Sequence, residues 1–338
     1  MIAVLDCGTT NTKCYVVTRS GALLAEGYSP FGVKDNALKT DREDYKRELR
    51  KIVQETCGKV KNSGPLEQVV AFGMISSDLG IEVVPHLTTP AGLAEFQESL
   101  YTAQGEALFS GNVPLQLIRG VKNSLPHARS IQNVEVCDFM RGEETQVMGI
   151  LSHYAPQEAF NVIMFGSHFK IIHVTADGKI ARSMTTMSGQ IFDSLIHHTV
   201  IGSSVAPGEL CSDGMSLQEI IRLAKETTEH RGLMRSFLLP RFMESFTNMT
   251  AAERYRYLDA VIALEDLKAI PEYYGSGCYS TKKYFFIGQR KRCELFAEVL
   301  RMAGGPCKIE ILEKEANRDI SIEGALKIIN NETGRNNQ

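Results

Sequence analysis

Residues 1–13 read Met-Ile-Ala-Val-Leu-Asp-Cys-Gly-Thr-Thr-Asn-Thr-Lys, and this stretch decides the fold. A short apolar strand leads into Asp6, whose carboxylate can hold a hydrated Mg²⁺. Gly8 allows a tight backbone turn beside a polyphosphate, and Lys13 adds a positive charge. Three residues between them offer N–H and hydroxyl donors to phosphate oxygens: Thr9, Thr10 and Asn11. The stretch therefore predicts a phosphate-binding loop.

The same residues also fit an ordinary β-hairpin, with Cys14–Thr18 as its second strand. As a phosphate loop, the stretch resembles the first phosphate loop of the superfamily that contains actin, hexokinase and the Hsp70 ATPase domain. This resemblance implies an α/β fold of two similar ribonuclease H-like (actin-like ATPase) domains flanking an interdomain cleft. It also implies ATP and Mg²⁺ as cofactors. Other segments of the chain bear on whether this stretch is a phosphate loop or an ordinary β-hairpin.

The composition is that of an ordinary globular protein, with 338 residues, 43% hydrophobic and 23% charged. The net charge of -3 gives no electrostatic case for nucleic acid as a partner. No apolar run approaches the roughly 18 residues that would span a bilayer, so no membrane partner is expected. A chain of this length allows two domains that each bury a core.

Eight cysteines are scattered along the chain without a CxxC pair, which indicates reduced thiols rather than a disulfide framework. The start of the sequence lacks a basic region and contains Asp6, so we expect no secretory signal. Together these features predict a cytoplasmic protein. The sequence leaves the oligomeric state open, with a homodimer as one arrangement.

The pattern of apolar residues predicts two similar halves. The first half opens with three strands, followed by a surface helix at 41–61 and a short buried strand at 69–73. A strand is also expected at Ile131–Cys137, and a helix from Gly142 to about Leu151. The second half repeats the strand–turn–strand–turn–strand order. Its strands are expected at 161–165, 170–175 and 180–185.

Pro156 interrupts the pattern between the halves, which predicts an N-terminal domain at 1–155 and a C-terminal domain at 156–338. The second domain is expected to contain helices at 216–227, 251–267 and 291–302 and strands at 284–287 and 308–311. The polar tail, 330–338, is expected to be frayed.

Arg141-Gly142-Glu143-Glu144-Thr145-Gln146 begins the helix just before the predicted boundary. Carboxylates in a first helical turn have a simple explanation, because they complement the helix dipole. At this position, however, the helix would point into the cleft, where a carboxylate could take a proton from a sugar hydroxyl that attacks a phosphoryl group.

Two further segments fit a nucleotide. Residues 164–170 contain Gly166, Ser167 and His168 in a turn that can form a second phosphate loop, although a plain β-turn with an incidental His also fits. Tyr284–Ile287 is an apolar strand that ends in Gly288, where the backbone could approach an adenosine closely. A single glycine there would also suit any strand–helix turn. The order of these segments favours the actin-like interpretation.

The run Met140-Arg141-Gly142-Glu143-Glu144-Thr145-Gln146 is similar to the MRGEETQ signature of the 2-dehydro-3-deoxygalactonokinase family. Four more blocks match that family in its order: GMISSDLG at 73–80, PHLTTPA at 85–91, GSHFK at 166–170 and TMSG at 186–189. The resemblance covers roughly residues 1–200 well. It implies an ATP-dependent kinase of a sugar acid, which phosphorylates the 6-hydroxyl of 2-dehydro-3-deoxygalactonate in D-galactonate catabolism.

The resemblance also implies roles for individual residues. Asp6 would organise Mg²⁺, with Thr9, Thr10 and Lys13 at the phosphates. Glu143 occupies the place of the catalytic base, and Glu144 is its rival. The sugar pocket would be lined by Ser76, Ser77 and Asp78, with His168 and Lys170 near the phosphates or the substrate. For the carboxylate of a sugar acid, the candidate cations are Arg141 and Lys170.

The chain departs from the family at Cys7, where a Trp is usual, and at Ser76–Ser77, where the family usually has Gly-Ser. These differences leave the acceptor open, so a different small sugar or polyol is an alternative substrate. An actin-like nucleotide-binding regulator on the same scaffold is the alternative from another class of protein.

Overall fold

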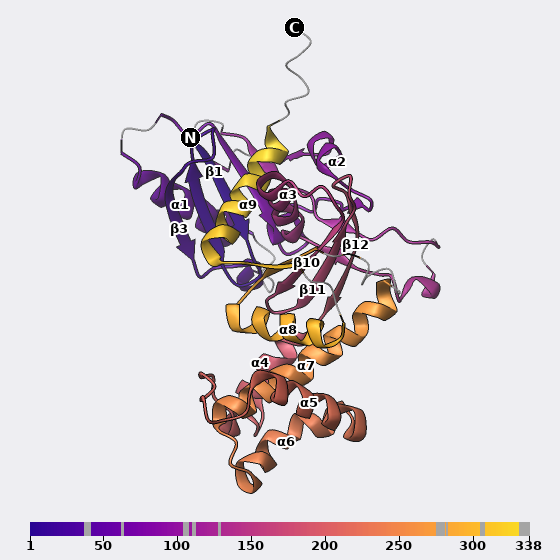
Figure 1. Cartoon of the computed structure of the whole chain (residues 1–338). Helices are drawn as coiled ribbons and strands as arrows, with labels where there is room; N and C mark the ends of the chain where they lie inside the picture. Colours follow the sequence, from indigo (N-terminus) through magenta and orange to yellow (C-terminus); the bar gives the residue numbers. More distant parts are fainter. Residues whose placement is uncertain are drawn as a thin grey trace. The chain divides into compact units, whose positions relative to one another are not determined.

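The computed structural model describes residues 1–36, 42–61, 64–103, 108–109, 113–127, 130–274, 281, 283–304 and 308–330. The chain divides into two compact units, and each combines helices with a β-sheet (Figure 1). The first unit comprises Met1–Glu158, His173–Ser183 and Lys314–Gln338, and the second comprises Ala159–Ile172 and Met184–Glu313. The predicted α/β fold is confirmed. The division at residue 155 and the cleft between two domains stay predictions.

The first unit contains a six-stranded sheet of order β3-β2-β1-β4-β7-β6. Its strands are β1 (Ile2–Cys7), β2 (Thr12–Val17), β3 (Leu23–Ser29), β4 (Gln68–Gly73), β6 (Tyr101–Thr102) and β7 (Leu115–Leu117). Strands β1, β2 and β3 are antiparallel neighbours, while β4 pairs with β1 in parallel. The predicted N-terminal strands and the strand at 69–73 are therefore confirmed.

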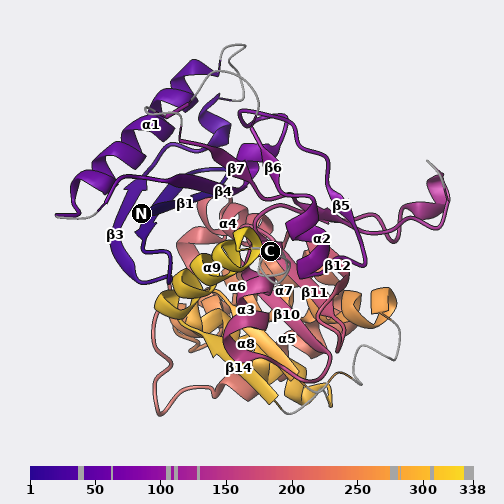
Figure 2. The same ribbon diagram turned by 90° about the horizontal axis from the view of Figure 1, so that it is seen from above.

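Alternation along β1 assigns its side chains to the two faces of this sheet. Ala3, Leu5 and Cys7 belong to a buried cluster with Tyr45 and Leu49 of α1 (Glu43–Gly58), which confirms the predicted surface helix. The other face carries α3 (Glu143–Tyr154) and α9 (Lys314–Ile329), as Figure 2 shows. Asp6 faces α3 and α9, because it alternates with Leu5 and Cys7.

The remaining strands of the first unit form a small sheet of order β5-β8-β9. They are β5 (Leu87–Thr88), β8 (Val121–Lys122) and β9 (Phe139–Met140), and α2 (Leu93–Glu98) follows β5. The strand predicted at Ile131–Cys137 is wrong, because the segment starts as a 3₁₀ turn, Ile131–Asn133. Ser130 caps this turn, and the Asn133 side chain bonds to the backbone of His127. Such local bonds compete successfully with strand pairing.

The second unit contains most of a five-stranded sheet of order β12-β11-β10-β13-β14. Its strands are β10 (Phe160–Phe165), β11 (Phe169–Val174), β12 (Ile180–Thr186), β13 (Lys283–Ile287) and β14 (Lys308–Leu312). Parts of β11 and β12 are counted with the first unit. All five predicted strands of the second half are confirmed to within two residues.

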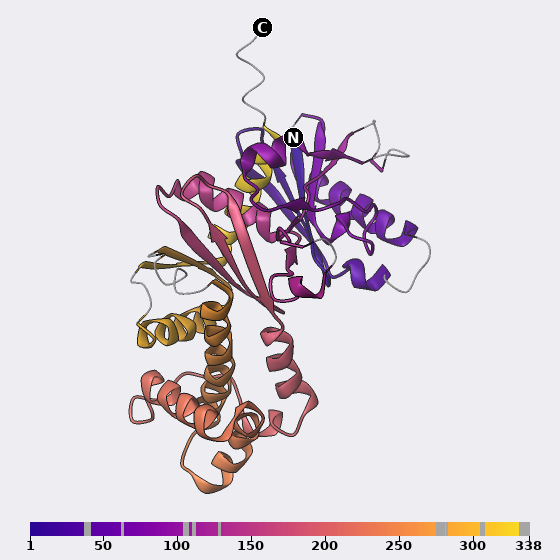
Figure 3. The same cartoon turned by 90° about the vertical axis from the view of Figure 1, so that its right-hand side faces the viewer.

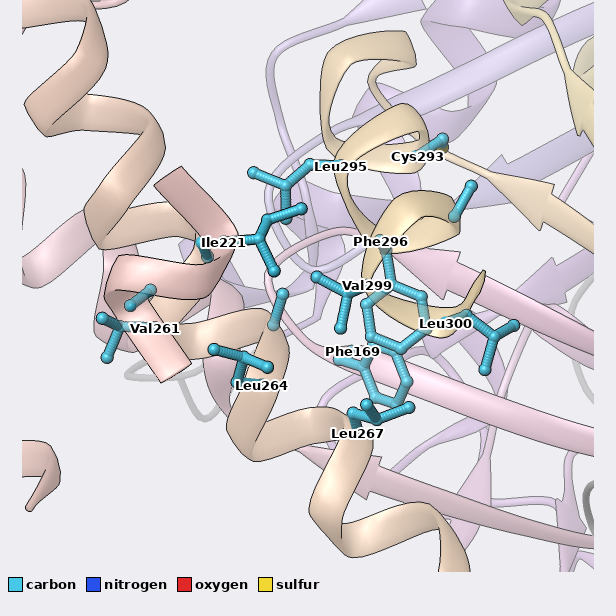
Figure 4. Close-up of a cluster of buried hydrophobic side chains, with 14 of the residues drawn as sticks. Phe169, Ile221, Val261, Leu264, Leu267, Cys293, Leu295, Phe296, Val299 and Leu300 are labelled. Atoms are coloured by element: carbon cyan, nitrogen blue, oxygen red, sulfur yellow. The ribbon is translucent and has the colours of Figure 1, made fainter. Parts of the chain in front are cut away.

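Helices cover this sheet and extend beyond it (Figure 3). They are α4 (Ser188–His198), α5 (Leu217–Arg231), α6 (Leu233–Phe246), α7 (Ala251–Tyr274) and α8 (Arg290–Met302). Phe169 of β11 packs on Phe296 of α8 with ring centroids 5.2 Å apart, beside Leu264 of α7 (Figure 4). The predicted helices at 216–227, 251–267 and 291–302 are confirmed, whereas the sequence pattern does not predict α4, α6 or α9.

Among the residues that the structure describes, no helix is both long and apolar enough to cross a membrane. At the predicted boundary, α3 ends at Tyr154, and Ala155 caps it in the left-handed conformation with φ of 39°. Strand β10 begins five residues later. The tail predicted to be frayed lies, after Asn330, outside the described residues.

Candidate functional site

The first predicted phosphate loop is a tight turn between β1 and β2. The Gly8 N–H donates to the carbonyl oxygen of Asn11 at 2.9 Å, and this bond closes the turn. Thr9 and Thr10 are exposed, and the Asn11 side chain donates to the Thr10 hydroxyl at 3.2 Å. The turn thus presents its polar groups to solvent, where they can meet an anion.

Gly32 supports this loop from outside. The next two amides, of Val33 and Lys34, donate to the carbonyl oxygens of Gly8 and Thr9 at 3.3 and 3.0 Å. A Cβ at position 32 would lie only 2.4 Å from the Thr9 carbonyl oxygen, so a side chain there would displace the turn. The loop therefore depends on a glycine that the sequence pattern does not single out.

Asp6 and Lys13 lie opposite each other on β1 and β2, and their side chains form an ion pair at 3.2 Å. Both border a cavity of about 640 Å³, which Gln146 of α3 and Arg318 of α9 also line. No cluster of three or more His, Cys, Asp or Glu side chains that could hold a metal occurs among the described residues. Mg²⁺ needs only one or two carboxylates, because it keeps most of its waters. The partly exposed Asp6 fits such an ion.

The two candidate bases at the start of α3 lie in different surroundings. Glu144 is fully buried, and its two carboxylate oxygens accept the Gly142 N–H at 2.8 and 2.9 Å. Burial, followed by the neighbouring charge of Glu143, raises the pKa of Glu144 to about 8. Glu143 is only partly buried. Solvent therefore reaches part of the Glu143 residue, whereas it does not reach Glu144.

Three acceptors hold the Arg141 guanidinium. It donates to Ser76 Oγ and to the Val84 carbonyl oxygen, both at 2.8 Å, and lies 3.5 Å from His86 Nδ1. Burial and the nearby Arg141 charge lower the pKa of His86 to about 4, so its ring is neutral near pH 7. Gly120 makes room for both side chains, since a Cβ there would lie 2.6 Å from Arg141 Cγ.

The structure brings only part of the predicted sugar loop to Arg141. Ser76 is buried against it, and its hydroxyl also donates to the Gly73 carbonyl oxygen at 3.2 Å. The Ser77 hydroxyl donates to the Met74 carbonyl oxygen at 2.7 Å, which stabilises the turn. Asp78 is exposed. Two of the three predicted residues therefore have bonds within the loop itself.

The second predicted phosphate loop lies at the turn between β10 and β11. The Gly166 N–H donates to the His168 carbonyl oxygen at 3.0 Å, and Ser167 Oγ lies 3.1 Å from His168 Nδ1. Helix α4 packs directly on this turn, where the Gln190 N–H donates to the Ser167 carbonyl oxygen at 2.8 Å. A Cβ at Gly189 would lie 2.0 Å from the Gly166 carbonyl oxygen, so this close approach requires glycine.

A cavity of about 410 Å³ in the second unit adjoins this turn. Gly288 lies behind it, where a Cβ would lie 2.7 Å from Phe165 Cβ. The aromatic pair Phe192–Tyr255 lines the cavity, with ring centroids 5.2 Å apart. The polar lining includes Gly166, His168, Arg256, Gln289, Lys291 and Arg292. Aromatic rings next to cations suit a flat base that carries phosphates, so the residues fit a nucleotide.

Arg292, which borders this cavity, is the centre of a buried charge network. It forms ion pairs with Asp259 and, at 3.5 Å, with Asp266 of α7. The hydroxyls of Thr186 and Ser188 donate to Asp266, while burial raises the pKa of this carboxyl to about 6. The network links α7, α8 and the start of α4. Two aspartates seven residues apart, Asp259 and Asp266, flank the apolar run 260–264 of α7 and were the signal for it in the sequence.

Lys170, which was predicted to lie near the phosphates or the substrate, is buried in the sheet of the second unit. Its residue is 5% exposed, and its ammonium donates to the Thr185 hydroxyl of the neighbouring strand at 2.6 Å. It is not among the residues that line the 410 Å³ cavity. Alternation along β11 places Lys170 on the face opposite Phe169, and the burial of nearly every residue of this strand shows that both faces are covered.

The sequence is similar to one protein family and to two curated relatives. A model of the 2-keto-3-deoxy-galactonokinase family matches residues 6–321. A probable 2-dehydro-3-deoxygalactonokinase of Rhizobium meliloti (strain 1021) is 26% identical over 212 residues, which are 63% of this chain and 61% of the relative. The 2-dehydro-3-deoxygalactonokinase of Escherichia coli (strain K12) is 28% identical over 148 residues, 44% of each chain. The matches thus span less than two thirds of these curated relatives.

Solved structures share the fold over nearly the whole chain. A protein from Sinorhizobium meliloti, assigned as a 2-dehydro-3-deoxygalactonokinase, has a TM-score of 0.72 at 21% identity and covers 96% of this chain and 98% of its own. A carbohydrate kinase from Novosphingobium aromaticivorans has a TM-score of 0.52 at 12% identity, with 97% and 93% covered. Since the family model matches nearly the whole sequence, the chain belongs to the 2-keto-3-deoxy-galactonokinase family.

Proposed function

We propose that this chain is an ATP-dependent kinase that phosphorylates the 6-hydroxyl of 2-dehydro-3-deoxygalactonate, or of a closely related sugar acid, in D-galactonate catabolism. One observation carries the proposal. The start of α3 presents an anchored cation, Arg141, two residues from a partly exposed carboxylate, Glu143. A sugar acid needs both groups, one for its carboxylate and one for its reacting hydroxyl. The names of the curated relatives support the same acceptor.

Arg141 is the proposed receptor for the acceptor's carboxylate. A guanidinium can donate two parallel hydrogen bonds to a carboxylate, and bonds to Ser76 and Val84 already fix its plane. Such preorganisation lowers the entropy cost of binding. Lys170 is the weaker candidate, because its ammonium is buried against Thr185.

Glu143 is the proposed general base. It would take the proton from the acceptor hydroxyl as the oxygen attacks, so that the proton ends on the Glu143 carboxylate. Glu144 would instead hold the helix start in place through the Gly142 N–H. Burial favours the neutral form of Glu144, which makes this carboxyl the weaker candidate for a proton acceptor.

The fit of the residues supports Mg-ATP as the cofactor, which supplies the phosphoryl group when it is bound. Asp6 would hold the metal through its waters. Phosphate oxygens would accept from the turn formed by Gly8, Thr9, Thr10 and Asn11, with Lys13 as the neighbouring cation. In the second unit, Gly166, Ser167 and His168 would meet phosphates, and the cavity beside Gly288 would take the base.

A substrate screen tests the proposal. Release of ADP is measured with 2-keto-3-deoxy acids, aldonic acids, uronates, neutral sugars and polyols as acceptors. We expect turnover with the 2-keto-3-deoxy acids and little with neutral compounds. If only a neutral sugar or a polyol is turned over, the acceptor is not a sugar acid. Nucleotide-dependent assembly without any acceptor-dependent ADP release would favour the regulator and refute the kinase.

The first prediction concerns the base. Glu143→Gln should lower kcat by a factor of about 10² to 10⁴, the range for loss of a general base. The dissociation constant for ATP, measured by calorimetry, should stay nearly unchanged. Glu144→Gln is the matched control and should retain kcat within about tenfold, since it replaces a buried group that the substrate does not reach. Full activity in Glu143→Gln would show that the base is wrongly assigned.

A further inference from the structure

His86 and Arg141 lie in one row across the small sheet β5-β8-β9. Strand β5 pairs in parallel with β8, and β8 pairs with β9 in the antiparallel direction. His86 directly precedes β5, Gly120 directly precedes β8 and Arg141 directly follows β9, so the three residues continue the same row. A Cβ at Gly120 would lie 2.8 Å from His86 Cδ2 and 2.6 Å from Arg141 Cγ. The glycine between them therefore lets an imidazole and a guanidinium lie side by side.

This row belongs to the outer face of the small sheet, because side chains alternate between the two faces of a sheet. The adjacent row, which contains Val121 and Met140, is buried. The row after it returns to the outer face and contains Lys122 and Phe139, which are both exposed. The rings of Phe139 and His86 lie 5.4 Å apart, as expected for rows that share a face. The outer face thus carries an imidazole, a guanidinium, an ammonium and an exposed aromatic ring.

The contact with Arg141 fixes the tautomer of His86. A guanidinium has only donors, and Nη2 of Arg141 lies 3.5 Å from His86 Nδ1. A proton on Nδ1 would point at this guanidinium, so Nδ1 accepts and the neutral ring carries its proton on Nε2. Burial, followed by the charges of Arg141 and Lys122, lowers the pKa of His86 to about 4, which keeps the ring neutral near pH 7. His86 therefore offers a single donor, its Nε2–H.

This donor lacks an acceptor. Nε2 of His86 is buried, and it has no hydrogen-bond partner in the part of the chain that the structure describes. Buried polar groups in folded proteins almost always have partners, so this donor marks a place where a ligand can supply one. Phe139, whose ring flanks the imidazole, is 65% exposed. Its side chain has room to swing outward and admit such a ligand.

We propose that His86 is a specificity-determining residue of the acceptor site, whose Nε2–H donates to an oxygen at the carboxylate end of the sugar acid while Arg141 binds the carboxylate. This inference rests on the proposed function, in which Arg141 is the receptor for that carboxylate. Three groups on this face can donate, namely His86, Arg141 and Lys122, and two of them are cations. A carboxylate supplies both the acceptor oxygens and the negative charge that they require, whereas a neutral sugar lacks the charge.

Two amide variants separate this role from mere support of Arg141. The side-chain oxygen of Asn can replace Nδ1 as the acceptor for Arg141, but Asn has no donor at the Nε2 position. The side-chain nitrogen of Gln reaches about as far as Nε2 and keeps a donor there. We expect His86→Asn to raise KM for the sugar acid by a factor of about 10 to 100, the loss of one hydrogen bond to a charged group, with kcat nearly unchanged. His86→Gln should return KM to within about threefold of the native chain.

Steady-state kinetics with 2-dehydro-3-deoxygalactonate measure these effects, and circular dichroism checks that both variants are folded. KM for ATP should be the same in all three proteins. The reverse order, with His86→Asn native-like and His86→Gln impaired, would show that His86 only supports Arg141 and would overturn the proposal. Equal KM for the acid in both variants would overturn it as well, because only Gln keeps the donor.

NMR of the ring nitrogens tests the contact in the native chain, without turnover. In isotopically labelled protein, these nitrogens report the tautomer and the pKa of His86, and the His86→Gln variant identifies their signals. Addition of 2-dehydro-3-deoxygalactonate without ATP should shift the Nε2 signal and raise the pKa of His86, because a carboxylate beside the ring favours its protonated form.

The NMR titration also distinguishes failure of this contact from failure of the proposed function. No change in the His86 signals at about 10 mM acid, which would saturate a site of millimolar affinity, would overturn the contact even if the kinase is active. An acid that shifts Nε2 but is not phosphorylated would support the contact and refute the kinase.

Discussion

At the residue scale, burial separates the roles of two neighbouring carboxylates. Glu143 and Glu144 are chemically identical and adjacent, and the sequence left both as candidates for the base. The helix start buries Glu144 completely and directs it at the Gly142 N–H, where φ of 112° requires glycine. One carboxylate therefore stabilises the turn into α3, and the other, which is partly exposed, is the one proposed as the base.

The second prediction follows from the pKa of Glu144, which is about 8 in the folded chain against an ordinary value of 4.5. The folded state binds this proton more tightly, so the stabilisation it gives is complete below about pH 4.5 and is lost as pH rises towards 8. A tenfold difference in proton affinity corresponds to about 1.4 kcal/mol, so the total loss is on the order of a few kcal/mol.

Urea unfolding at several pH values measures this loss. Glu144→Gln cannot ionise, so its free energy of unfolding relative to the native chain should rise between pH 5 and pH 8. The variant Glu143→Gln, which removes the partly exposed neighbour, should show a smaller change. A difference between Glu144→Gln and the native chain that does not vary with pH would contradict a raised pKa.

Residue types and local spacing were enough to find some of the candidate site. The turn at Gly8–Asn11 and the block at Arg141–Glu144 are contiguous in the sequence, and the chemistry of each can be read locally. Gly32 supports this turn, and Gln146 and Arg318 line the cavity beside Asp6, all from other elements. Their contribution depends on packing between distant segments, about which a single sequence carries no direct information.

At the element scale, α3 keeps its position because two glycines let α9 cross it closely. A Cβ at Gly149 would lie 1.9 Å from the Ile320 carbonyl oxygen, and one at Gly324 would lie 1.9 Å from the Thr145 carbonyl oxygen. Backbone atoms cannot move aside as flexible side chains can. The crossing thus holds the helix that carries Glu143, and Gln146 adds a 3.4 Å bond to Ser321.

The third prediction is that Gly149→Ala destabilises the chain by about 2 kcal/mol or more, because overpacking against a backbone carbonyl forces the helices apart. Thermal or urea unfolding gives the free energy. Gly58→Ala is the matched control in α1, since nothing lies within 4 Å of a Cβ there. Gly58→Ala should leave the free energy of unfolding unchanged or raise it by up to about 1 kcal/mol. Equal effects of both variants would contradict the close crossing.

Strongly patterned elements could be predicted from the sequence, and elements with mixed patterns could not. Among the strands that were predicted, β1, β2, β4, β10 and β13 have apolar runs of aliphatic or aromatic residues, whereas the short strands β5 to β9, of two or three residues each, were not predicted. Helix α6 contains Pro240 and is apolar on two sides, so it lacks the single apolar face by which a helix is recognised. At Ile131–Cys137, apolar residues suggested a strand, but bonds from Ser130 and Asn133 to the backbone form a turn instead.

At the scale of the whole molecule, the order of the elements along the chain differs from their grouping into the two compact units. Helix α9 comes last in the described sequence, yet it belongs to the first unit, where it packs on α3 and on the sheet face that carries Asp6. From sequence order alone, a C-terminal segment is assigned to the domain that precedes it in the chain. The close crossing of α9 with α3 and the burial of Ile320, Ile322 and Leu326 show that the chain returns to the first unit.

The last prediction is that a chain ending at Glu313 loses the first unit selectively. Without α9, the side of α3 that carries Thr145 and Gly149 and part of the first sheet lose their cover, and the apolar area buried there becomes exposed. Hydrogen exchange should rise strongly in β1, β4 and α3 of the shortened chain. The strands β10 and β13 and helix α8 serve as the internal control and should keep their protection, because their core does not include α9. Unchanged exchange in β1, or equal loss of protection in both units, would show that α9 is not specific to the first unit.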